Sequence, residues 1–306
     1  MNDVVLALDV GGTGIKCALV DPSGTVRHAE RHATRRERGT AAVVETVLDV
    51  AAGLAATAQA AGLRPRAAGV VVPGVIDEAR GMAVWSANLG FRDIPLRDLM
   101  SKRLGLPATL GHDVRAGGLA EARLGAGRGY RHVFVVAIGT GIAAAHVVDG
   151  RVFAGAHGAA GEIGHIVVRP DGPKCGCGNH GCLEAIASAS SVARRYLEHT
   201  GQVGGADQVA KLALAGDPGA GAVWQETVAA LADGLLTGLA LFDPEILVVG
   251  GGLAEAGDAL LTPLRDALKA RITFHREPAL ERAALGDEAG CLGAALLALE
   301  TIGAAP

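Results

Sequence analysis

Residues 4–20 read Val-Val-Leu-Ala-Leu-Asp-Val-Gly-Gly-Thr-Gly-Ile-Lys-Cys-Ala-Leu-Val, two apolar runs around a glycine-rich centre. A short apolar run that stops at glycines is typical of a buried strand followed by a tight turn. The segment therefore predicts a hairpin, with Asp9 before the turn and Lys16 after it. Glycine lets backbone amides approach a phosphate closely, while the carboxylate suits hydrated magnesium and the lysine a phosphoryl oxygen. An ordinary hairpin with an exposed lysine is the alternative.

Strands and helices are predicted to alternate after this hairpin. The pattern predicts strands from residue 26 onward and over 68–72 and 108–110, and helices over 40–61, 96–104 and 113–124. A strand-rich start followed by alternation indicates the α/β class.

The glycine-rich turn has an echo in the second half of the chain. Gly12-Thr-Gly-Ile15 recurs as Gly139-Thr-Gly-Ile142, and both copies lie between apolar runs that end in an aspartate at a turn. The matching flanks predict a duplicated hairpin, one in each half of the chain. The second copy has Val136 and Ala143 at the offsets of the aspartate and lysine, so the charged groups belong to the first copy alone.

Length and composition set outer limits. With 306 residues the chain exceeds one ordinary domain, so we expect two lobes. Its 28 basic and 32 acidic residues give a net charge of −4, which argues against nucleic acid or anionic membrane as a partner. Aromatic residues make up 3%, too few for stacking on single strands.

The N-terminus lacks the basic and apolar regions of a signal peptide. The most apolar later stretch, residues 133–148, contains two glycines and a histidine and falls short of the roughly 18 residues of a membrane span. We therefore expect a cytoplasmic protein.

The cysteine count is five, an odd number that argues against a secreted disulfide framework. Three of the five lie in Cys175-Gly-Cys-Gly-Asn-His-Gly-Cys182, where a glycine-rich loop could wrap one metal ion. Zinc is the favoured ion, and a cluster of reduced thiols is the alternative. Cys17 and Cys291 lie alone in apolar runs and are predicted to be core residues.

A tetrahedral zinc site needs a fourth ligand, and three histidines are near: His157, His165 and His180. His180 lies inside the loop, where folding back onto the same ion is hard. His165 precedes the loop by ten residues, at a predicted strand start, and can reach it. Glu162 and Glu184 flank the loop as candidate groups for a hydroxylated ligand, or as solvated surface charges.

Several of these motifs together resemble one family. Asp9-Val-Gly-Gly-Thr-Gly-Ile-Lys16 resembles the first phosphate motif of the ROK sugar kinases, in the actin-like ATPase superfamily. Gly161-Glu-Ile-Gly-His165, followed by the cysteine pattern up to Glu184, resembles the ROK signature, and Val248-Val-Gly-Gly-Gly252 resembles the glycine loop at the nucleoside end. The resemblance covers essentially the whole chain. It implies a two-lobed actin-like ATPase (ribonuclease H-like) fold with duplicated α/β domains around a cleft.

We expect a small lobe of residues 1–111 plus 289–306 and a large lobe of 112–288 that carries the zinc loop. Asp113 matches the family's catalytic aspartate, which would accept the proton of a sugar hydroxyl as that oxygen attacks the γ-phosphate of Mg-ATP. At the junction of the lobes, domain closure would keep water from competing as acceptor.

The resemblance implies three sets of ligands. The sugar would meet Gly74, Asn88, His112, Asp113, Glu162, His165 and Glu184. The nucleotide and its magnesium would meet Asp9, Gly11, Gly12, Thr13, Lys16, Gly139, Thr140, Gly141, Gly250, Gly251 and Gly252. A structural zinc would be held by His165, Cys175, Cys177 and Cys182. His112 stands where the family usually has an asparagine that reads a sugar hydroxyl.

The resulting hypothesis is an ATP-dependent hexose kinase that phosphorylates the 6-hydroxyl of glucose, with ATP, Mg²⁺ and structural Zn²⁺ as cofactors. Because His112 replaces the usual asparagine, the alternative is a kinase for N-acetylmannosamine, N-acetylglucosamine, an amino sugar or a cyclitol. A third hypothesis is a sugar-binding regulator without kinase activity. Family repressors carry a helix-turn-helix before the phosphate motif, for which the residues ahead of Asp9 leave no room. The arginine-rich run 31–38 is predicted to be a solvated loop, and a homo-oligomer (dimer or tetramer) is expected from the resemblance alone.

Overall fold

The computed structural model describes residues 2–304, which form two compact units. The first unit contains residues 2–120, 154–160 and 287–304, and the second contains Glu121–Phe153 and Gly161–Gly286. Each unit is built on a five-stranded sheet.

The first sheet has the order β3-β2-β1-β4-β8. Its strands are β1 (Asp3–Val10), β2 (Gly14–Val20), β3 (Val26–Ala33), β4 (Arg64–Val72) and β8 (Ala108–His112). β1 is antiparallel to β2 and β2 to β3, whereas β1, β4 and β8 run parallel. The predicted first hairpin is therefore confirmed, with Asp9 paired to Lys16 across it.

The second sheet has the order β11-β10-β9-β12-β13. Its strands are β9 (His132–Ile138), β10 (Ile142–Val148), β11 (Arg151–Val152), β12 (Ile246–Gly250) and β13 (Ala279–Arg282). The directions repeat those of the first sheet, since β9, β10 and β11 are antiparallel and β9, β12 and β13 are parallel. The duplication predicted from the repeated quartet is confirmed.

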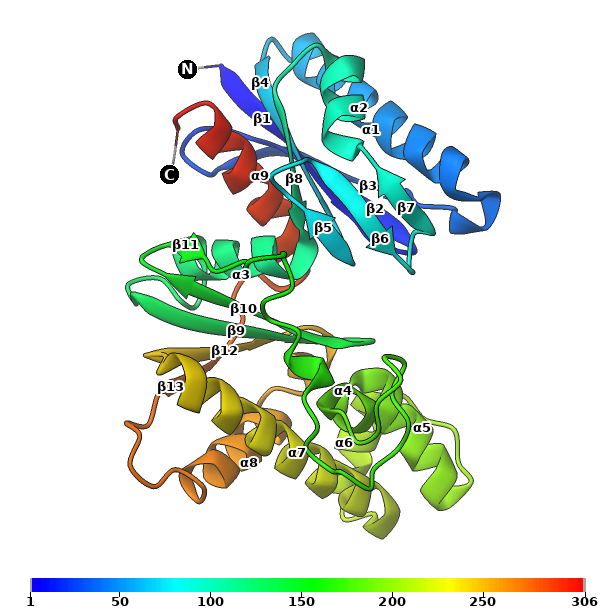
Figure 1. Ribbon diagram of the computed structural model, residues 1–306, viewed down its shortest axis with the longest axis vertical. Coiled ribbons are helices and arrows are strands. Elements are labelled where there is room, and N and C mark those ends of the chain that lie inside the picture. The colour runs from blue at the N-terminus through cyan, green and yellow to red at the C-terminus, as the bar shows by residue number, and fades with distance from the viewer. Residues whose placement is uncertain (1, 305–306) are drawn as a thin grey trace. The chain divides into compact units, whose positions relative to one another are not determined.

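Helices cover both faces of the first sheet (Figure 1). α1 (Thr40–Ala60) and α2 (Leu96–Leu104) pack on one face, and α9 (Ala289–Thr301) packs on the other. The apolar side chains of each strand alternate between these two cores: Leu6 and Leu8 face α1, while Val5 and Ala7 face α9. Both faces of the central strands are thus buried, as expected of a parallel sheet.

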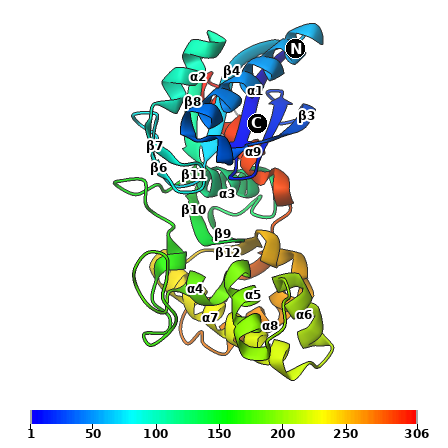
Figure 2. The same cartoon turned by 90° about the vertical axis from the view of Figure 1, so that its right-hand side faces the viewer.

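The helices of the second unit gather on one side of its sheet (Figure 2). They are α4 (Leu183–Ala187), α5 (Ala189–Thr200), α6 (Ala206–Leu214), α7 (Pro218–Phe242) and α8 (Asp258–Lys269). α7 forms the centre of this layer and buries Leu231 and Leu235 in the same core as Val136 and Ile138 of β9.

The remaining elements are short. They are the three-stranded sheet β5 (Val75–Asp77), β6 (Met82–Ser86) and β7 (Phe91–Ile94), the helix α3 (Asp113–Leu124), and the 3-10 turns η1 (Arg36–Arg38), η2 (Ile163–His165), η3 (Gly252–Ala256) and η4 (Gly286–Glu288). η2 departs from prediction, because His165 ends a 3-10 turn and does not start a strand.

The division between the units differs from the predicted lobe boundary after residue 111. The first turns of α3 belong to the first unit because they pack tightly on α9. Gly293 lies against the backbone of Ala116, where an added Cβ would come within 2.1 Å of the carbonyl oxygen. The sequence showed where α3 begins but not which helix it packs against.

In the part of the chain that the structure describes, one helix, α1, has the length and apolar composition of a membrane span. Its apolar face, including Val43, Val47 and Leu54, is buried in the core of the first unit. Its outer face carries Glu45 and Asp49, both bonded to an arginine of α2. These contacts describe a helix that covers a sheet in a protein core.

Candidate functional site

The carboxyl ends of β1, β4 and β8 bring together most of the predicted residues of the first unit. Asp9 is next to last in β1, Gly74 follows β4, and His112 and Asp113 lie at the end of β8. Because the three strands are parallel neighbours, these positions share one edge of the sheet, where α/β proteins bind ligands.

The turn between β1 and β2 is held in a defined shape by its own backbone. The Gly11 N–H donates to the Gly14 carbonyl over 2.8 Å, and Thr34 donates to the carbonyls of Thr13 (backbone N–H, 3.1 Å) and Gly11 (hydroxyl, 2.6 Å). Gly12 is packed against Asn88, since a Cβ on it would lie 3.3 Å from the Asn88 carbonyl oxygen. The predicted phosphate loop and the predicted sugar ligand Asn88 are therefore neighbours.

Lys16 is held by carboxylates on two sides. Its Nζ lies 3.7 Å from Asp9 Oδ2, donates to the Asp287 backbone carbonyl over 3.0 Å, and also bonds to the Asp287 carboxylate. Asp287 in turn accepts from Arg31 over 2.7 Å. Asp287 is the main polar residue that sequence reasoning missed, because 271 positions separate it from Lys16 and no local pattern marks the contact.

The Asp9 carboxyl group is poorly solvated. Its pKa is raised to about 6, mainly by burial; Lys16 opposes the shift, and the negative charges of Asp113 and Asp287 add to it. The start of α9 encloses the group, since a Cβ on Gly290 would lie 2.5 Å from Asp9 Oδ2. A carboxylate with this environment gains from a nearby cation, as a magnesium partner would.

Asp113 occupies the first position of α3. Burial is the main cause that raises its pKa, while the Val114 N–H, which donates to its Oδ1 over 2.7 Å, and the charge of Arg115 act in the opposite direction. A raised pKa makes the carboxylate a better proton acceptor, and the hydrogen bond from Val114 fixes its orientation. Both properties suit a general base.

His112 is buried and neutral. Burial, with the positive charge of Arg115, lowers its pKa to about 4, and Glu78 opposes the shift. His112 Nδ1 lies 3.4 Å from the Arg115 backbone N–H and also 3.4 Å from Asp113 Oδ1. His112 is thus a neutral ring with one N–H to donate. Arg115 is itself fixed by Glu78 over 2.8 Å and by the Gly158 carbonyl over 2.7 Å.

Gly74 cannot be replaced by a larger residue without moving the backbone. Its φ is +113°, and a Cβ would come within 2.2 Å of the Trp85 carbonyl oxygen. The chain leaving β4 therefore packs directly against β6.

The predicted residues of the second unit assemble around the turn between β9 and β10. Glu184, on α4, accepts a hydrogen bond from the Ile142 N–H over 2.9 Å. A Cβ on Gly141 would lie 2.5 Å from Glu184 Oε2, so the glycine makes room for the carboxylate. Ser190, near the start of α5, donates to the Thr140 carbonyl over 2.7 Å.

Glu162 and His165 are carried by a segment that lies directly on β10. Gly161 and Gly164 allow this approach, since a Cβ on Gly161 would come within 2.0 Å of the Ala144 carbonyl and one on Gly164 within 2.2 Å of the Ile142 carbonyl. The two side chains are close, with His165 Nε2 3.9 Å from Glu162 Oε2. The spacing Gly-Glu-Ile-Gly-His is thus a packing requirement that places both polar groups near the same hairpin.

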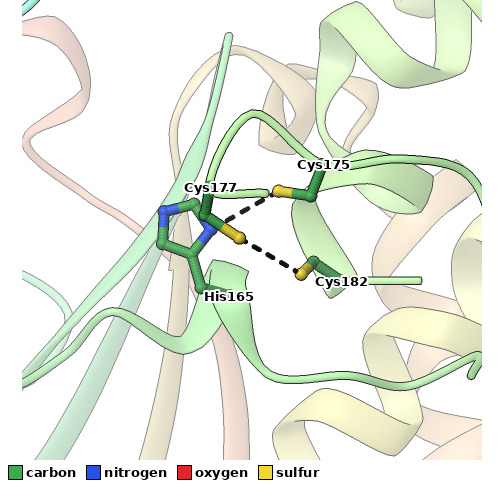
Figure 3. Close-up of side chains that lie close together, drawn as sticks. All are labelled: His165, Cys175, Cys177 and Cys182. Carbon is green, nitrogen blue, oxygen red and sulfur yellow. Dashed lines mark hydrogen bonds between the residues drawn. The ribbon is translucent and has the colours of Figure 1, made fainter. Parts of the chain in front are cut away.

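The three cysteines and His165 form one cluster (Figure 3). The sulfur of Cys175 lies 3.6 Å from His165 Nδ1, and the sulfurs of Cys177 and Cys182 are 3.7 Å apart. All four donor atoms lie within 4.8 Å of one another. Tetrahedral zinc with Zn–S bonds of about 2.3 Å requires sulfurs about 3.8 Å apart, so the donor set fits this ion.

The third glycine loop follows β12. Gly251 has a φ of +82°, and a Cβ on it would lie 2.5 Å from the Ile138 carbonyl at the end of β9. The predicted loops at Gly139–Gly141 and Gly250–Gly252 therefore lie side by side in the second unit. Their glycines leave backbone exposed at the carboxyl ends of two parallel strands.

The arginine-rich run 31–38 was predicted to be a solvated loop, but only part of it is one. Its first residues belong to β3, where Arg31 bonds to Asp287 and Glu288, and residues 36–38 form η1. The acidic partners come from η4, which the sequence placed at a domain boundary and not beside β3.

Comparison with known proteins now identifies the family. The model of the ROK family matches residues 5–301 of this chain. The chain belongs to the ROK family. A relative from Thermotoga maritima, described as a glucokinase, is 34% identical over 98% of this chain and 98% of its own.

A solved ROK structure agrees with this assignment. It is described as a ROK family glucokinase from Streptomyces griseus in complex with glucose and AMPPNP, is 30% identical, covers 97% of this chain and 99% of its own, and has a TM-score of 0.82. The fold is accordingly the duplicated α/β fold of the actin-like ATPases. ROK relatives also include the DNA-binding transcriptional repressor Mlc of Escherichia coli, 31% identical over 67% of this chain and 53% of its own.

Proposed function

We propose that this ROK protein is an ATP-dependent hexose kinase that transfers the γ-phosphate of ATP to the 6-hydroxyl of glucose. The observation that carries the proposal is the partly buried Asp113, whose side chain is 28% exposed and whose pKa is raised, at the sheet edge that also holds the phosphate loop. Full-length relatives described as glucokinases support the substrate.

Asp113 acts as the general base. An alcohol is a weak nucleophile, and a carboxylate within hydrogen-bond reach orients it and takes its proton as the oxygen attacks phosphorus. The hydrogen bond from Val114 occupies Oδ1, which leaves Oδ2 for the sugar hydroxyl. The phosphoryl group moves to the sugar oxygen, and ADP leaves.

The first hairpin binds the phosphates of ATP. The backbone of Gly11, Gly12 and Thr13 accommodates them, and Lys16 exchanges part of its contact with Asp287 for a phosphoryl oxygen. When bound, Mg²⁺ neutralises charge on the phosphates, and the poorly solvated carboxylate of Asp9 is placed to orient its water shell. In the second unit, Gly139, Thr140 and Gly141 with Gly250, Gly251 and Gly252 serve the nucleotide.

The sugar hydroxyls are read by a carboxamide, two carboxylates and two imidazoles, which are Asn88, Glu162, Glu184, His112 and His165, with Gly74 at the wall of the pocket. A carboxylate that accepts from two adjacent hydroxyls rejects the epimer, because a misplaced hydroxyl leaves a buried charge unpaired. The contact of Glu184 with the Ile142 N–H holds that carboxylate in place.

We further propose a structural zinc on His165, Cys175, Cys177 and Cys182. Zinc bound there would hold the loop closed and fix the ring of His165 through Nδ1, which leaves Nε2 for the sugar. Free thiols in this loop would require a reducing compartment, which agrees with a cytoplasmic kinase that uses ATP. We also propose a homo-oligomer that does not bind nucleic acid.

The test incubates the pure protein with Mg-ATP and each of a panel of hexoses, and measures the ADP that phosphate transfer releases. Asp113→Asn should lower kcat by a factor of about 10³ or more, while sugar binding, measured by calorimetry, persists. Asp98→Asn, an exposed aspartate on α2, is the matched control and should keep full activity. Sugar binding without turnover in the zinc-loaded wild type would overturn the kinase and favour a regulator.

A second candidate is a kinase for N-acetylmannosamine, N-acetylglucosamine, an amino sugar or a cyclitol. The neutral His112, where the family usually has asparagine, favours it, since a ring N–H donor can meet an acetamido oxygen or a hydroxyl. Catalytic efficiencies for glucose and these compounds, in wild type and His112→Asn, decide between the two. A preference for an N-acetyl sugar that reverts to glucose in the variant would establish the second candidate.

A further inference from the structure

The strand pair β2–β3 presents two polar groups on opposite faces. Lys16 and Arg31 are cross-strand partners on one face, where both meet Asp287. The next pair along the strands, Cys17 and Glu30, points to the other face, because successive side chains alternate. The proposed function uses the first face and leaves the second unexplained.

The second face carries a row of metal-binding side chains. His28, Glu30 and His32 occupy alternate positions of β3, so they share one face, and Cys17 lies directly across from the central glutamate. Glu30 Oε1 lies 3.2 Å from His32 Nε2 and 3.7 Å from Cys17 Sγ. Its other oxygen, Oε2, lies 3.5 Å from His28 Nε2.

A thiolate, an imidazole and a carboxylate are the three ligand types that zinc takes from proteins. The donor atoms of Cys17, Glu30 and His32 all lie within 4.8 Å of one another, and bonds of about 2.0–2.3 Å around one ion require separations of about 3.3–3.8 Å. We propose that Cys17, Glu30 and His32 bind a second zinc ion, distinct from the ion of the cysteine loop, with water in the fourth position.

The three ligands differ in burial, so a zinc ion would enter the site from the side of the exposed His32. Cys17 is 1% exposed and lies between the fully buried Ile15 and Leu19, whereas the side chain of His32 is 39% exposed. An ion arriving from solvent would therefore meet the imidazole and carboxylate first and the thiol last. Zinc binding would release the thiol proton, which Cys17 directs at Glu30 Oε1.

His28 has a positioning role in this arrangement. It contacts the Glu30 oxygen that faces away from the ion, and such a partner orients a ligating carboxylate. Its own donor atom lies outside the set of three that approach one another within 4.8 Å.

The site would tie an edge strand to the phosphate loop. Within residues 2–304, β3 pairs only with β2 in the sheet, and β2 begins at the last glycine of the loop. Thr34, one residue after β3, already bonds to Gly11 and Thr13 of that loop. A zinc ion between Cys17 and the edge strand would add a cross-link that fixes the outer wall of the loop.

The experiment counts zinc on the full chain. Protein stripped by a chelator is titrated with Zn²⁺ in competition with a chromophoric chelator, and the wild type should bind about two ions per chain. The variant Glu30→Gln/His32→Gln should bind only the ion of the cysteine loop. The variant Cys177→Ser should bind only the ion at Cys17, Glu30 and His32. His28→Gln should keep both ions, with one about tenfold weaker. Cys291→Ser removes another lone buried thiol of the same unit and is the matched control, which should keep two.

Both changed ligands in the double variant are at least partly exposed, so the fold should survive, and circular dichroism checks it. A wild type that binds a single ion, lost on Cys177→Ser, overturns the proposal, as does a folded double variant that still binds two. The count needs no turnover. A failure of the kinase assay therefore leaves this result standing, and the reverse also holds.

Discussion

The two five-stranded sheets share strand order and direction, yet their hairpin turns differ in length and in chemistry. In the first unit four residues, Gly11 to Gly14, join Val10 to Ile15. In the second unit three residues join Ile138 to Ile142. The second cross-strand pair away from the turn is Asp9 and Lys16 in the first sheet. In the second sheet the corresponding pair is two alanines, Ala137 and Ala143.

This register corrects the comparison made from sequence, which matched Asp9 to Val136. Because the second turn is one residue shorter, the structural counterpart of Asp9 is Ala137. The conclusion survives, since both are small or apolar. The two copies share an arrangement of strands, and the charged pair of Asp9 and Lys16 occurs in the first copy alone.

The second unit gains its polar groups in another way. In the first unit α1 follows β3 after one 3-10 turn, whereas in the second the glycine-rich segment at 161–165, the cysteine loop and α4 follow β11. These insertions bring Glu162, His165 and Glu184 to the hairpin. In the first unit the predicted polar site residues Asp9 and Lys16 therefore lie on the hairpin strands. In the second unit Glu162, His165 and Glu184 lie on segments that follow the hairpin.

The largest expected effect comes from removing the charge that distinguishes the first hairpin. Asp9→Asn should lower kcat by a factor of about 10²–10³ with Mg-ATP, because the carboxylate is the only partner offered to magnesium in this proposal. Ala137→Ser, the matched change in the second hairpin, should leave kcat nearly unchanged. Steady-state kinetics of both variants test the asymmetry. Equal losses would show that the two hairpins contribute alike.

The next effect tests whether the inserted loop of the second unit serves the sugar. Cys177→Ser removes a proposed zinc ligand, frees His165, and should raise the KM for glucose about 10–100-fold. The KM for ATP should change little, because the nucleotide contacts are assigned to the glycine loops. If instead both constants rose together, the loop would support the whole unit and not the sugar contacts in particular.

Much of the first unit could be predicted because its signals are local. α2 and α3 have the bounds that apolar periodicity gave them, and both strands of the first hairpin appear within one residue of prediction. β11 and β13, with two and four residues, are too short for a periodic signal and were not predicted. Each is an edge strand that exists because a neighbour provides hydrogen bonds.

The site was predictable where a motif carries it and not where distant segments meet. No local pattern indicates that Asp287 binds Lys16, because the contact depends on how α9 packs on the sheet. The 3-10 turn at His165 was also missed, since it arises from two glycines fitting onto β10. The cluster of Cys17, Glu30 and His32 was missed for the same reason, because it depends on the register of two strands.

A smaller effect is expected from one methyl group at equivalent positions of the two turns. Gly141→Ala places a Cβ 2.5 Å from Glu184 Oε2 and should displace that carboxylate, which raises the KM for sugar about tenfold, or roughly 1.4 kcal/mol. Gly14→Ala meets only the His32 carbonyl at 3.5 Å, an ordinary contact, and should be tolerated. Sugar titrations of both variants provide the measurement. A tolerated Gly141→Ala would place Glu184 outside the sugar site.

The last prediction concerns stability and not activity, and it again separates Asp9 from its apolar counterpart. Burial raises the pKa of Asp9 from 3.8 to about 6, so the folded chain holds this proton to higher pH than the unfolded chain does. Between about pH 4 and pH 6 the native state binds more protons, and its contribution to stability therefore falls as the pH rises and is constant above that window. The shift corresponds to a loss of about 3 kcal/mol at neutral pH.

Asp9→Asn removes this titration, so the free energy of unfolding of the variant relative to wild type should rise across about pH 4 to 6 and then level off. The difference between the two profiles isolates Asp9, because the opposite contribution of His112, whose pKa is lowered to about 4, is present in both proteins. Urea unfolding at a series of pH values gives the measurement, with the exposed Asp98→Asn as control. Parallel profiles for wild type and Asp9→Asn would mean that Asp9 is solvated in the folded protein, and the first hairpin would then lose its reason to attract a cation.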